Sequence, residues 1–211
     1  MMEMLVLVDK DDSPLGLAEK VSCHLPQGRL HRAFTVLLFD PKGRLLLARR
    51  SAGKMLWPGD WDGTVASHPR EGEGYVESGR RRLPEEIGAD CSLDYAFKFE
   101  YHVPYKDIGS ENEVCGTLAG IFDGPDPEPS VQEISEVRWA SAEELGKAVT
   151  EKPAEYCPWM LIALYLLPSS EPAFLAKYAG LLESWTGENM RRTLEGAISA
   201  HLPASSWRLV E

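Results

Sequence analysis

A set of histidines and glutamates scattered along the chain restricts how it can fold, because together they suit one metal site. His24, His31 and His68 lie in the segments CHLPQGRLHRAF and VASHP, and Glu111 and Glu113 lie in ENEVC. Side chains two apart on a strand share a face, so both carboxylates are expected on one side. Two close carboxylates need a cation between them. Three imidazoles and two carboxylates suit zinc, manganese or iron better than calcium.

The apolar pattern predicts a mixed α/β core followed by a helical tail. A hairpin is indicated where two leucine-rich runs, 31–40 and 44–50, are joined by Pro41-Lys42-Gly43. Further strands are expected at 4–9, 97–104, 113–122 and 136–140. Helices are expected at 72–87, at 141–149 with a Ser141 and Glu144 capping box, and in three apolar segments after residue 158. Pro84 inside the first of these helices predicts either a kink or a later start.

Composition excludes several classes of protein. A length of 211 residues favours one domain with a terminal extension. A net charge of −11 argues against nucleic acid as a partner. No apolar stretch is long enough to span a membrane. The start, MMEMLVLVDKDD, lacks the basic region of a signal peptide, so a cytoplasmic protein with reduced cysteines is expected.

Several short motifs together resemble type I isopentenyl diphosphate isomerases, which are built on the Nudix fold. The motifs are the histidine and Glu-Asn-Glu segments, Trp57-Pro58-Gly59, Ser67-His68-Pro69 and Pro158-Trp159. The resemblance implies an α+β protein, a Nudix-like α/β/α sandwich with a mixed sheet. It places a Nudix-type domain at residues 1–165 and a C-terminal helical extension, packed on the core, at 166–211. Residues 73–88 resemble a degenerate Nudix box in which Arg82 replaces a magnesium-binding glutamate, and this replacement disfavours Nudix hydrolysis.

The resemblance also implies a site with three parts. The metal ligands are His24, His31, His68, Glu111 and Glu113, and Glu86 helps to carry a magnesium ion that bridges to the diphosphate. Four cations bind phosphate oxygens: Lys20, Arg50, Lys54 and Arg82. At the hydrocarbon end, beside Trp57, Trp159 faces a developing carbocation and Tyr101 hydrogen-bonds the catalytic Glu113. The implied cofactors are Mg²⁺ and a second divalent ion, Mn²⁺ or Zn²⁺. The implied partner is a prenyl diphosphate, bound by a monomer by default, with a dimer as the alternative.

The residue at position 66 departs from the family pattern. The family has a catalytic cysteine there, and this chain has Ala66. A positioned acid or base is worth about 10²–10⁴-fold in rate, and isomerisation asks for two of them. The expected function is therefore isomerisation of isopentenyl to dimethylallyl diphosphate with proton chemistry at Glu113, impaired by Ala66 unless Cys115 supplies a thiol. Two alternatives stay open: a homologue that protonates and cyclises or rearranges a longer prenyl diphosphate, and a non-catalytic prenyl-diphosphate-binding protein.

Overall fold

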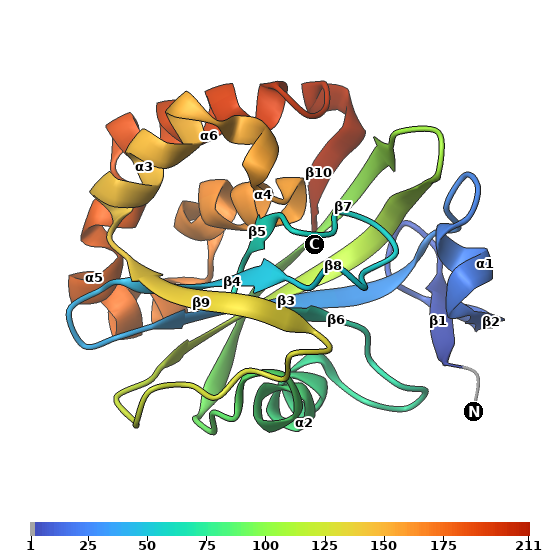
Figure 1. The fold of residues 1–211 in the computed structure, drawn as a ribbon, viewed down its shortest axis with the longest axis horizontal. Coiled ribbons are helices and arrows are strands. Elements are labelled where there is room, and N and C mark those ends of the chain that lie inside the picture. The colour runs from blue at the N-terminus through green and yellow to red at the C-terminus, as the bar shows by residue number, and fades with distance from the viewer. Residues whose placement is uncertain (1–2) are drawn as a thin grey trace.

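One mixed sheet lies between two helical layers in the computed structural model, which describes residues 3–211 (Figure 1). Met1 and Met2, at the start of the segment examined for a signal peptide, lie outside the described residues. The main path of the sheet runs β10-β7-β8-β3-β1-β2, while β4 and β6 pair with β3, and β5 and β9 pair with β4. The strands are β1 Met4–Val8, β2 Pro14–Glu19, β3 His31–Phe39, β4 Leu45–Arg50, β5 Trp61–Asp62, β6 Val65–Ser67, β7 Leu93–Tyr105, β8 Gly109–Ile121, β9 Ile134–Ala140 and β10 Trp207–Val210.

The helices lie on opposite faces of the sheet: α2 (Tyr75–Ile87) covers one face, and α3 to α6 cover the other (Figure 1). The remaining α-helices are α1 Lys20–His24, α3 Ala142–Glu151, α4 Pro158–Leu166, α5 Pro172–Thr186 and α6 Glu188–Ser199. Short 3₁₀ turns occupy Pro153–Glu155, Leu167–Ser169 and Ala204–Ser206. This arrangement confirms the expected α+β sandwich and the three helices after residue 158. It also confirms the hairpin β3–β4, although only Phe39 and Leu45 pair directly.

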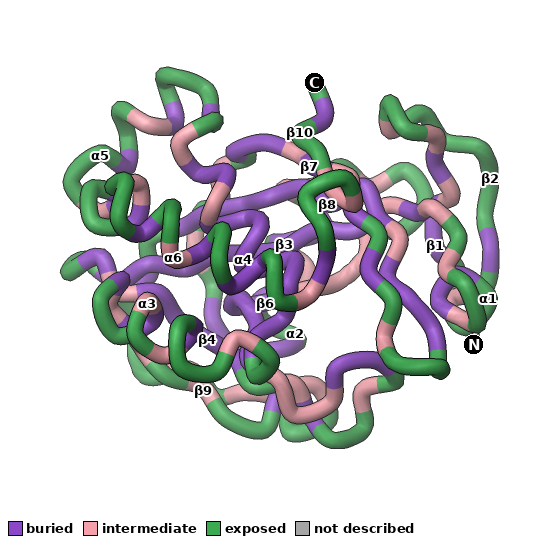
Figure 2. The backbone as a smooth tube through the Cα atoms, turned by 90° about the horizontal axis from the view of Figure 1, so that it is seen from above, coloured by how far each residue is buried: buried purple, intermediate pink, exposed green. Residues whose placement is uncertain are grey.

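Strand β3 organises the core because it is buried on both faces. Phe34, Val36 and Leu38 pack in a cluster with residues of α2, and Leu37 and Phe39 pack in the larger cluster under α4 to α6. Burying each such side chain contributes about 1.5–3 kcal/mol. Figure 2 shows the central strands buried along most of their length and the outer turns of the peripheral helices exposed.

Helix α2 positions part of the site and resolves the question raised by Pro84. It begins after Gly74, later than the expected residue 72, and runs through Pro84 to Ile87 before Gly88 ends it in the left-handed conformation. Gly79 lets the helix approach the sheet closely, since a Cβ there would lie 2.5 Å from a methyl carbon of Leu118. The close approach fixes the face of α2 that carries Arg82 and Glu86.

The C-terminal segment packs on the core through its helices and through one further strand, β10. Trp185 of α5 is fully buried and donates a hydrogen bond from Nε1 to the carbonyl of Gly43, at 2.8 Å. The capping box of Ser141 and Glu144 at the start of α3 is present as expected. After α6 the chain forms β10, which pairs with the edge of β7. The sequence pattern did not indicate this strand. Among the described residues, no single helix is long and apolar enough to cross a membrane; the segments 158–169 and 172–186 reach that length only as a pair bent by 112°.

Candidate active site

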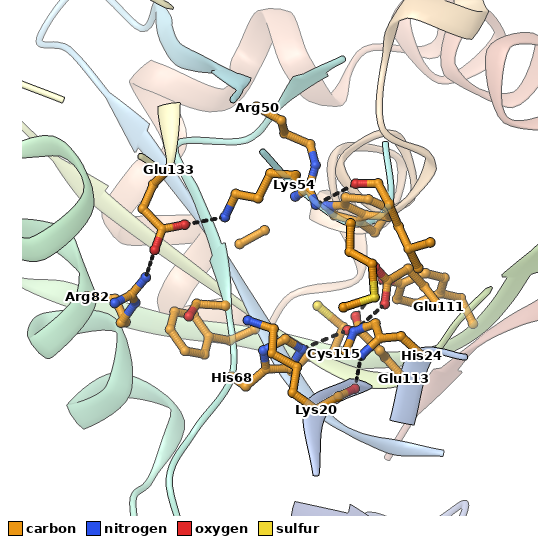
Figure 3. Close-up of a pocket in the computed structure, with 18 of the residues that line it drawn as sticks. Lys20, His24, Arg50, Lys54, His68, Arg82, Glu111, Glu113, Cys115 and Glu133 are labelled. Atoms are coloured by element: carbon orange, nitrogen blue, oxygen red, sulfur yellow. Dashed lines mark hydrogen bonds and ion pairs between the residues drawn. The ribbon is translucent and has the colours of Figure 1, made fainter. Parts of the chain in front are cut away.

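The sequence-predicted residues converge on one cavity of about 290 Å³ (Figure 3). Imidazoles and carboxylates line one end of it, which we call the imidazole end: His24, His68, Glu111 and Glu113. The fully buried His31 belongs to the same group through its contact with Glu113. Lys54, Arg82 and Glu133 line the other, the cationic end, and Glu86 is paired with Arg82 there. Lys20 also lines the cavity, beside His24 and His68 (Figure 3). Aromatic side chains, among them Tyr101 and Trp159, form part of the wall between them.

The register of three strands places Glu113 at the centre of the imidazole end. His31 is its direct neighbour on the parallel strand β3, and Tyr101 is its direct partner on the antiparallel strand β7. Oε1 of Glu113 lies 3.3 Å from Nε2 of His31 and 3.3 Å from Nε2 of His68. Oε2 accepts a hydrogen bond of 2.5 Å from the Tyr101 hydroxyl. Glu113 can therefore contact a metal ion through one oxygen while Tyr101 holds the other.

The imidazoles are oriented toward a common point by backbone carbonyls. Nδ1 of His24 lies 2.7 Å from the carbonyl oxygen of Lys20, and Nδ1 of His31 lies 2.7 Å from that of Arg29. A carbonyl only accepts, so Nδ1 carries a proton in both rings and Nε2 is the nitrogen that faces the other members of the group. Ligand atoms of His24, His31, His68 and Glu113 all lie within 4.8 Å of one another.

Two buried polar atoms show that this donor set fits a divalent cation. Nε2 of His31 and Oε2 of Glu111 are buried and make no hydrogen bond with any described residue. Glu111 lies beside the group of four rather than within it, since its Oε2 is 3.1 Å from Nε2 of His24. Both glutamates are on the same face of β8, as the period of two predicts. A borderline ion such as Zn²⁺ or Mn²⁺ suits three imidazoles and a carboxylate.

The protonation states follow from burial and from the neighbouring charges. Burial disfavours the charged form of His24, but the adjacent Glu111 carboxylate outweighs it and raises the pKa of His24 to about 9. Burial and the nearby His31 instead lower the pKa of His68. Burial opposes ionisation of Glu113, yet His31 and Tyr101 hold its pKa below the ordinary value. Burial and the charge of Glu113 raise the pKa of Tyr101, so the phenol stays protonated and donates a hydrogen bond to the carboxylate.

At the cationic end, carboxylates pair with the cations that were expected to bind phosphate. Lys54 donates to Glu133 at 2.5 Å, and Arg82 donates to Glu133 at 3.1 Å and to Glu86 at 2.6 Å. Lys20 donates to Glu3 at 2.9 Å. Glu133 was missed by the sequence analysis, because a single acidic residue between a polar loop and a strand carries no motif.

Arg50 is placed differently from the other three cations. Its Nε and Nη2 donate to the carbonyls of Trp57 and Leu56, at 3.0 and 2.9 Å, and its Nη1 donates to Asp62 at 3.2 Å. These contacts hold Trp57 in the left-handed conformation, with φ of 47°, which is strained for a tryptophan. Arg50 thus reaches the cavity wall with three of its donor groups already engaged.

The aromatic residues of the hydrocarbon end pack against one another. The ring of Trp159 lies 5.1 Å from that of Trp57 and 6.1 Å from that of Tyr101 between centroids, and it is almost fully buried. The Cys-Pro start of α4 fixes Trp159 at the first turn of that helix. An indole face next to the cavity can stabilise a developing cation.

Ala66 and Cys115 line the same cavity from different strands. Ala66 on β6 pairs with Thr35, and Cys115 on β8 pairs with Ala33, so β3 separates them. The methyl group of Ala66 has no proton to exchange. Burial raises the pKa of the Cys115 thiol well above its ordinary value, so this thiol is a poor base at neutral pH.

Comparisons with known proteins agree with this geometry. The NUDIX domain family matches residues 29–160. The "Isopentenyl-diphosphate Delta-isomerase" of Haloarcula marismortui is 42% identical over 169 residues, which cover 76% of this chain and 88% of that protein. The protein of the same name from Serratia proteamaculans is 35% identical over 177 residues, covering 84% and 98%.

A solved structure supports the fold alone. The crystal structure of DR0079 from Deinococcus radiodurans superposes with a TM-score of 0.59 at 23% identity, over 71% of this chain and 90% of that one. The fold, the site and the sequence identities lead to one conclusion: the chain belongs to the type I isopentenyl-diphosphate Delta-isomerase family, within the Nudix superfamily.

Proposed function

We propose that the chain interconverts isopentenyl and dimethylallyl diphosphate, with Glu113 as its proton-transfer group and with a rate limited by Ala66. The observation that carries the proposal is the position of Glu113. Its carboxylate lines the cavity, borders the imidazole cluster through Oε1 and accepts the Tyr101 hydrogen bond through Oε2. An acid held by both partners is positioned for transfer to a substrate carbon.

The chain's own residues account for the chemistry as follows. Because its pKa is low, Glu113 must first take up a proton from water. The protonated carboxyl then gives this proton to the terminal alkene carbon, which leaves a tertiary cation and a carboxylate. Trp159 faces this cation, while Tyr101 keeps the carboxylate in place. The cation then loses a proton from the neighbouring carbon to form the new double bond. Because Ala66 cannot accept that proton, it passes to water, and this step is slower by about 10²–10⁴-fold than with a positioned base.

The metal at the imidazole end would be held by His24, His31, His68 and Glu113, with Glu111 beside them. A divalent ion there supplies positive charge that increases the acidity of the Glu113 carboxyl. We propose Mn²⁺ or Zn²⁺ for this position because the donors are mainly imidazole nitrogens.

The cationic end supports a diphosphate that binds together with Mg²⁺. Lys54 and Arg82 face carboxylates already, so the end carries little net positive charge for a bare diphosphate. Glu86, which is 2% exposed, is the carboxylate that would bind the magnesium ion, and Lys20, Lys54 and Arg82 would contact the phosphate oxygens. Arg50 would contribute at the wall.

Neither alternative function gains support from an observation. The retained donor set and Tyr101–Glu113 pair would serve no purpose in a protein that only binds prenyl diphosphates.

A product assay with four diphosphates tests the proposal: isopentenyl, dimethylallyl, geranyl and farnesyl. We expect slow interconversion of the two five-carbon compounds by the protein with Ala66, a rate at least about 100-fold higher for Ala66→Cys, and none for Glu113→Gln. Unchanged activity in Glu113→Gln would overturn the proposal. A new hydrocarbon or rearranged diphosphate made from geranyl or farnesyl diphosphate would overturn it in favour of a redirected enzyme.

A further inference from the structure

Asp62 is a buried carboxylate that the proposed chemistry leaves without a role. It ends the short strand β5, pairs with Ala48 of β4 and is 3% exposed. A buried carboxylate is costly unless it is paired and hydrogen-bonded. Its partners therefore indicate what the carboxylate does.

The carboxylate of Asp62 joins three segments of the cavity wall. Oδ1 accepts hydrogen bonds from Nε1 of Trp159, at 2.8 Å, and from the backbone N–H of Gly63, at 2.7 Å. Oδ2 accepts from Nη1 of Arg50, at 3.2 Å. The same guanidinium holds the turn at Leu56 and Trp57.

The charges around Trp159 make this carboxylate relevant to a cationic intermediate. The guanidinium carbon of Arg50 lies 5.2 Å from the centre of the Trp159 ring. The positive charge of Arg50, so near the ring, opposes the approach of a carbocation. The Asp62 carboxylate, which is hydrogen-bonded to both Arg50 and Trp159, offsets the charge of Arg50. A carboxylate that accepts the indole N–H also increases the electron density of the ring, and cation–π attraction depends on that density.

We propose that Asp62 is a positioning residue for the isomerisation: it fixes the Trp159 ring and offsets the charge of Arg50, so that the indole can stabilise the carbocation. The inference rests on the proposed function. Asp62 acts through Trp159 and Arg50 and does not itself contact the substrate.

The test compares a diphosphate that carries a positive charge at its carbon end with one that has no carbon end. The two probes are inorganic pyrophosphate and a five-carbon diphosphate analogue with a protonated tertiary amine in place of the cationic carbon. In Asp62→Asn, which keeps the shape but loses the charge, we expect the affinity for the amine analogue to fall at least tenfold by calorimetry. The affinity for pyrophosphate should stay equal or increase, because the site becomes more positive. In Ala66→Cys protein, Asp62→Asn should lower kcat at least tenfold and change KM less than threefold.

The matched control is Asp40→Asn. Asp40 is also buried, at 6% exposed, and accepts hydrogen bonds from Lys42 and Arg44 in the β3–β4 turn, outside the cavity. We expect this variant to change neither affinity nor kcat. Equal weakening of both ligands by Asp62→Asn, or no weakening of the amine analogue, would overturn the inference.

A second variant keeps the test decisive if Asp62→Asn does not fold. Trp159→Phe removes the indole N–H but keeps an aromatic ring, so it should weaken the amine analogue and leave pyrophosphate affinity within threefold; unchanged affinity for the amine would overturn the inference. The indole N–H resonance of Trp159, assigned by its loss in Trp159→Phe, should shift in Asp62→Asn. If Ala66 and Ala66→Cys proteins both fail to isomerise, the proposed function fails, whereas the ligand comparison still reports separately on Asp62.

Discussion

The two ends of the cavity present charge in opposite ways. At the imidazole end, Nε2 of His31 and Oε2 of Glu111 are buried and make no hydrogen bond with any residue in 3–211. At the cationic end, Lys54 and Arg82 are paired with Glu133, and Arg82 also with Glu86. The first end gathers imidazole nitrogens and carboxylate oxygens that can converge on a cation, whereas the second offers positive charge that is largely balanced. The comparison indicates that the protein itself organises one metal site, and that the diphosphate must bring further positive charge with it.

Removing a ligand from the imidazole end should have the largest effect. His31→Ala deletes a fully buried imidazole whose Nε2 faces Glu113, so we expect the affinity for Mn²⁺ or Zn²⁺ to fall more than about 100-fold. The measurement is metal content and calorimetric titration after dialysis against a chelator. His102→Ala is the control, because His102 contacts Ser110 at 3.2 Å and lies outside the group of four ligands. Equal metal affinity in the two variants would remove the metal site from the imidazole end.

Opposite changes at the cationic end test whether its charge is balanced. Lys54→Ala should weaken binding of Mg²⁺–pyrophosphate by about 1.5–3 kcal/mol, as for a lost charged hydrogen bond. Glu133→Gln should strengthen binding of metal-free pyrophosphate, because Lys54 and Arg82 lose the carboxylate they share. Calorimetry with and without Mg²⁺ separates the two effects.

The exposed Lys147 on α3 provides the matched control for this pair, and Lys147→Ala should leave both affinities unchanged. Weaker binding of metal-free pyrophosphate by Glu133→Gln would show that Glu133 organises the site instead of neutralising it.

Structural features that depend on residues close together in the sequence could be predicted from the sequence. The alternation in ENEVC correctly placed Glu111 and Glu113 on one face, since a strand has a fixed period of two. The capping box at Ser141 and the apolar segments that form α4, α5 and α6 could be predicted for the same reason, because both signals lie within a few neighbouring residues. The family motifs then pointed to the segments that meet at the cavity.

Features that depend on partners distant in the sequence could not be predicted from it. Strand β10 exists because Trp207–Val210 finds the free edge of β7, whereas its own short sequence is ordinary. Glu133 and Asp62 are single acidic residues whose roles depend on Lys54, Arg82 and Trp159, and these hydrogen-bonded partners lie 51 to 97 residues away in the sequence. The roles assigned to the individual site residues remain predictions that the experiments above test.

The smallest predicted effect concerns a carboxylate at the start of α2. Glu73, just before α2, accepts two hydrogen bonds from Arg81, at 2.8 and 2.9 Å, and Arg81 also donates to the backbone carbonyl of His68 at 3.3 Å. The hydrogen bonds from Arg81, with further ones from Arg70 and Ser78, lower the pKa of Glu73 to about 2. Glu73→Gln should lower the free energy of unfolding by on the order of 1 kcal/mol at neutral pH.

The pH dependence gives this prediction its sign. A carboxyl with a pKa near 4.5 in the unfolded chain and about 2 in the fold binds more protons when unfolded. Its contribution to stability is therefore full above pH 4.5 and is lost as the pH falls toward 2. Urea unfolding from pH 7 to pH 3 should show the unsubstituted protein and Glu73→Gln converging at the acidic end, with Glu77→Gln, an exposed carboxylate on the same helix, following the unsubstituted protein throughout. A difference between Glu73→Gln and the unsubstituted protein that stayed constant with pH would mean that the Glu73 side chain contributes by packing and not through its ion pair with Arg81.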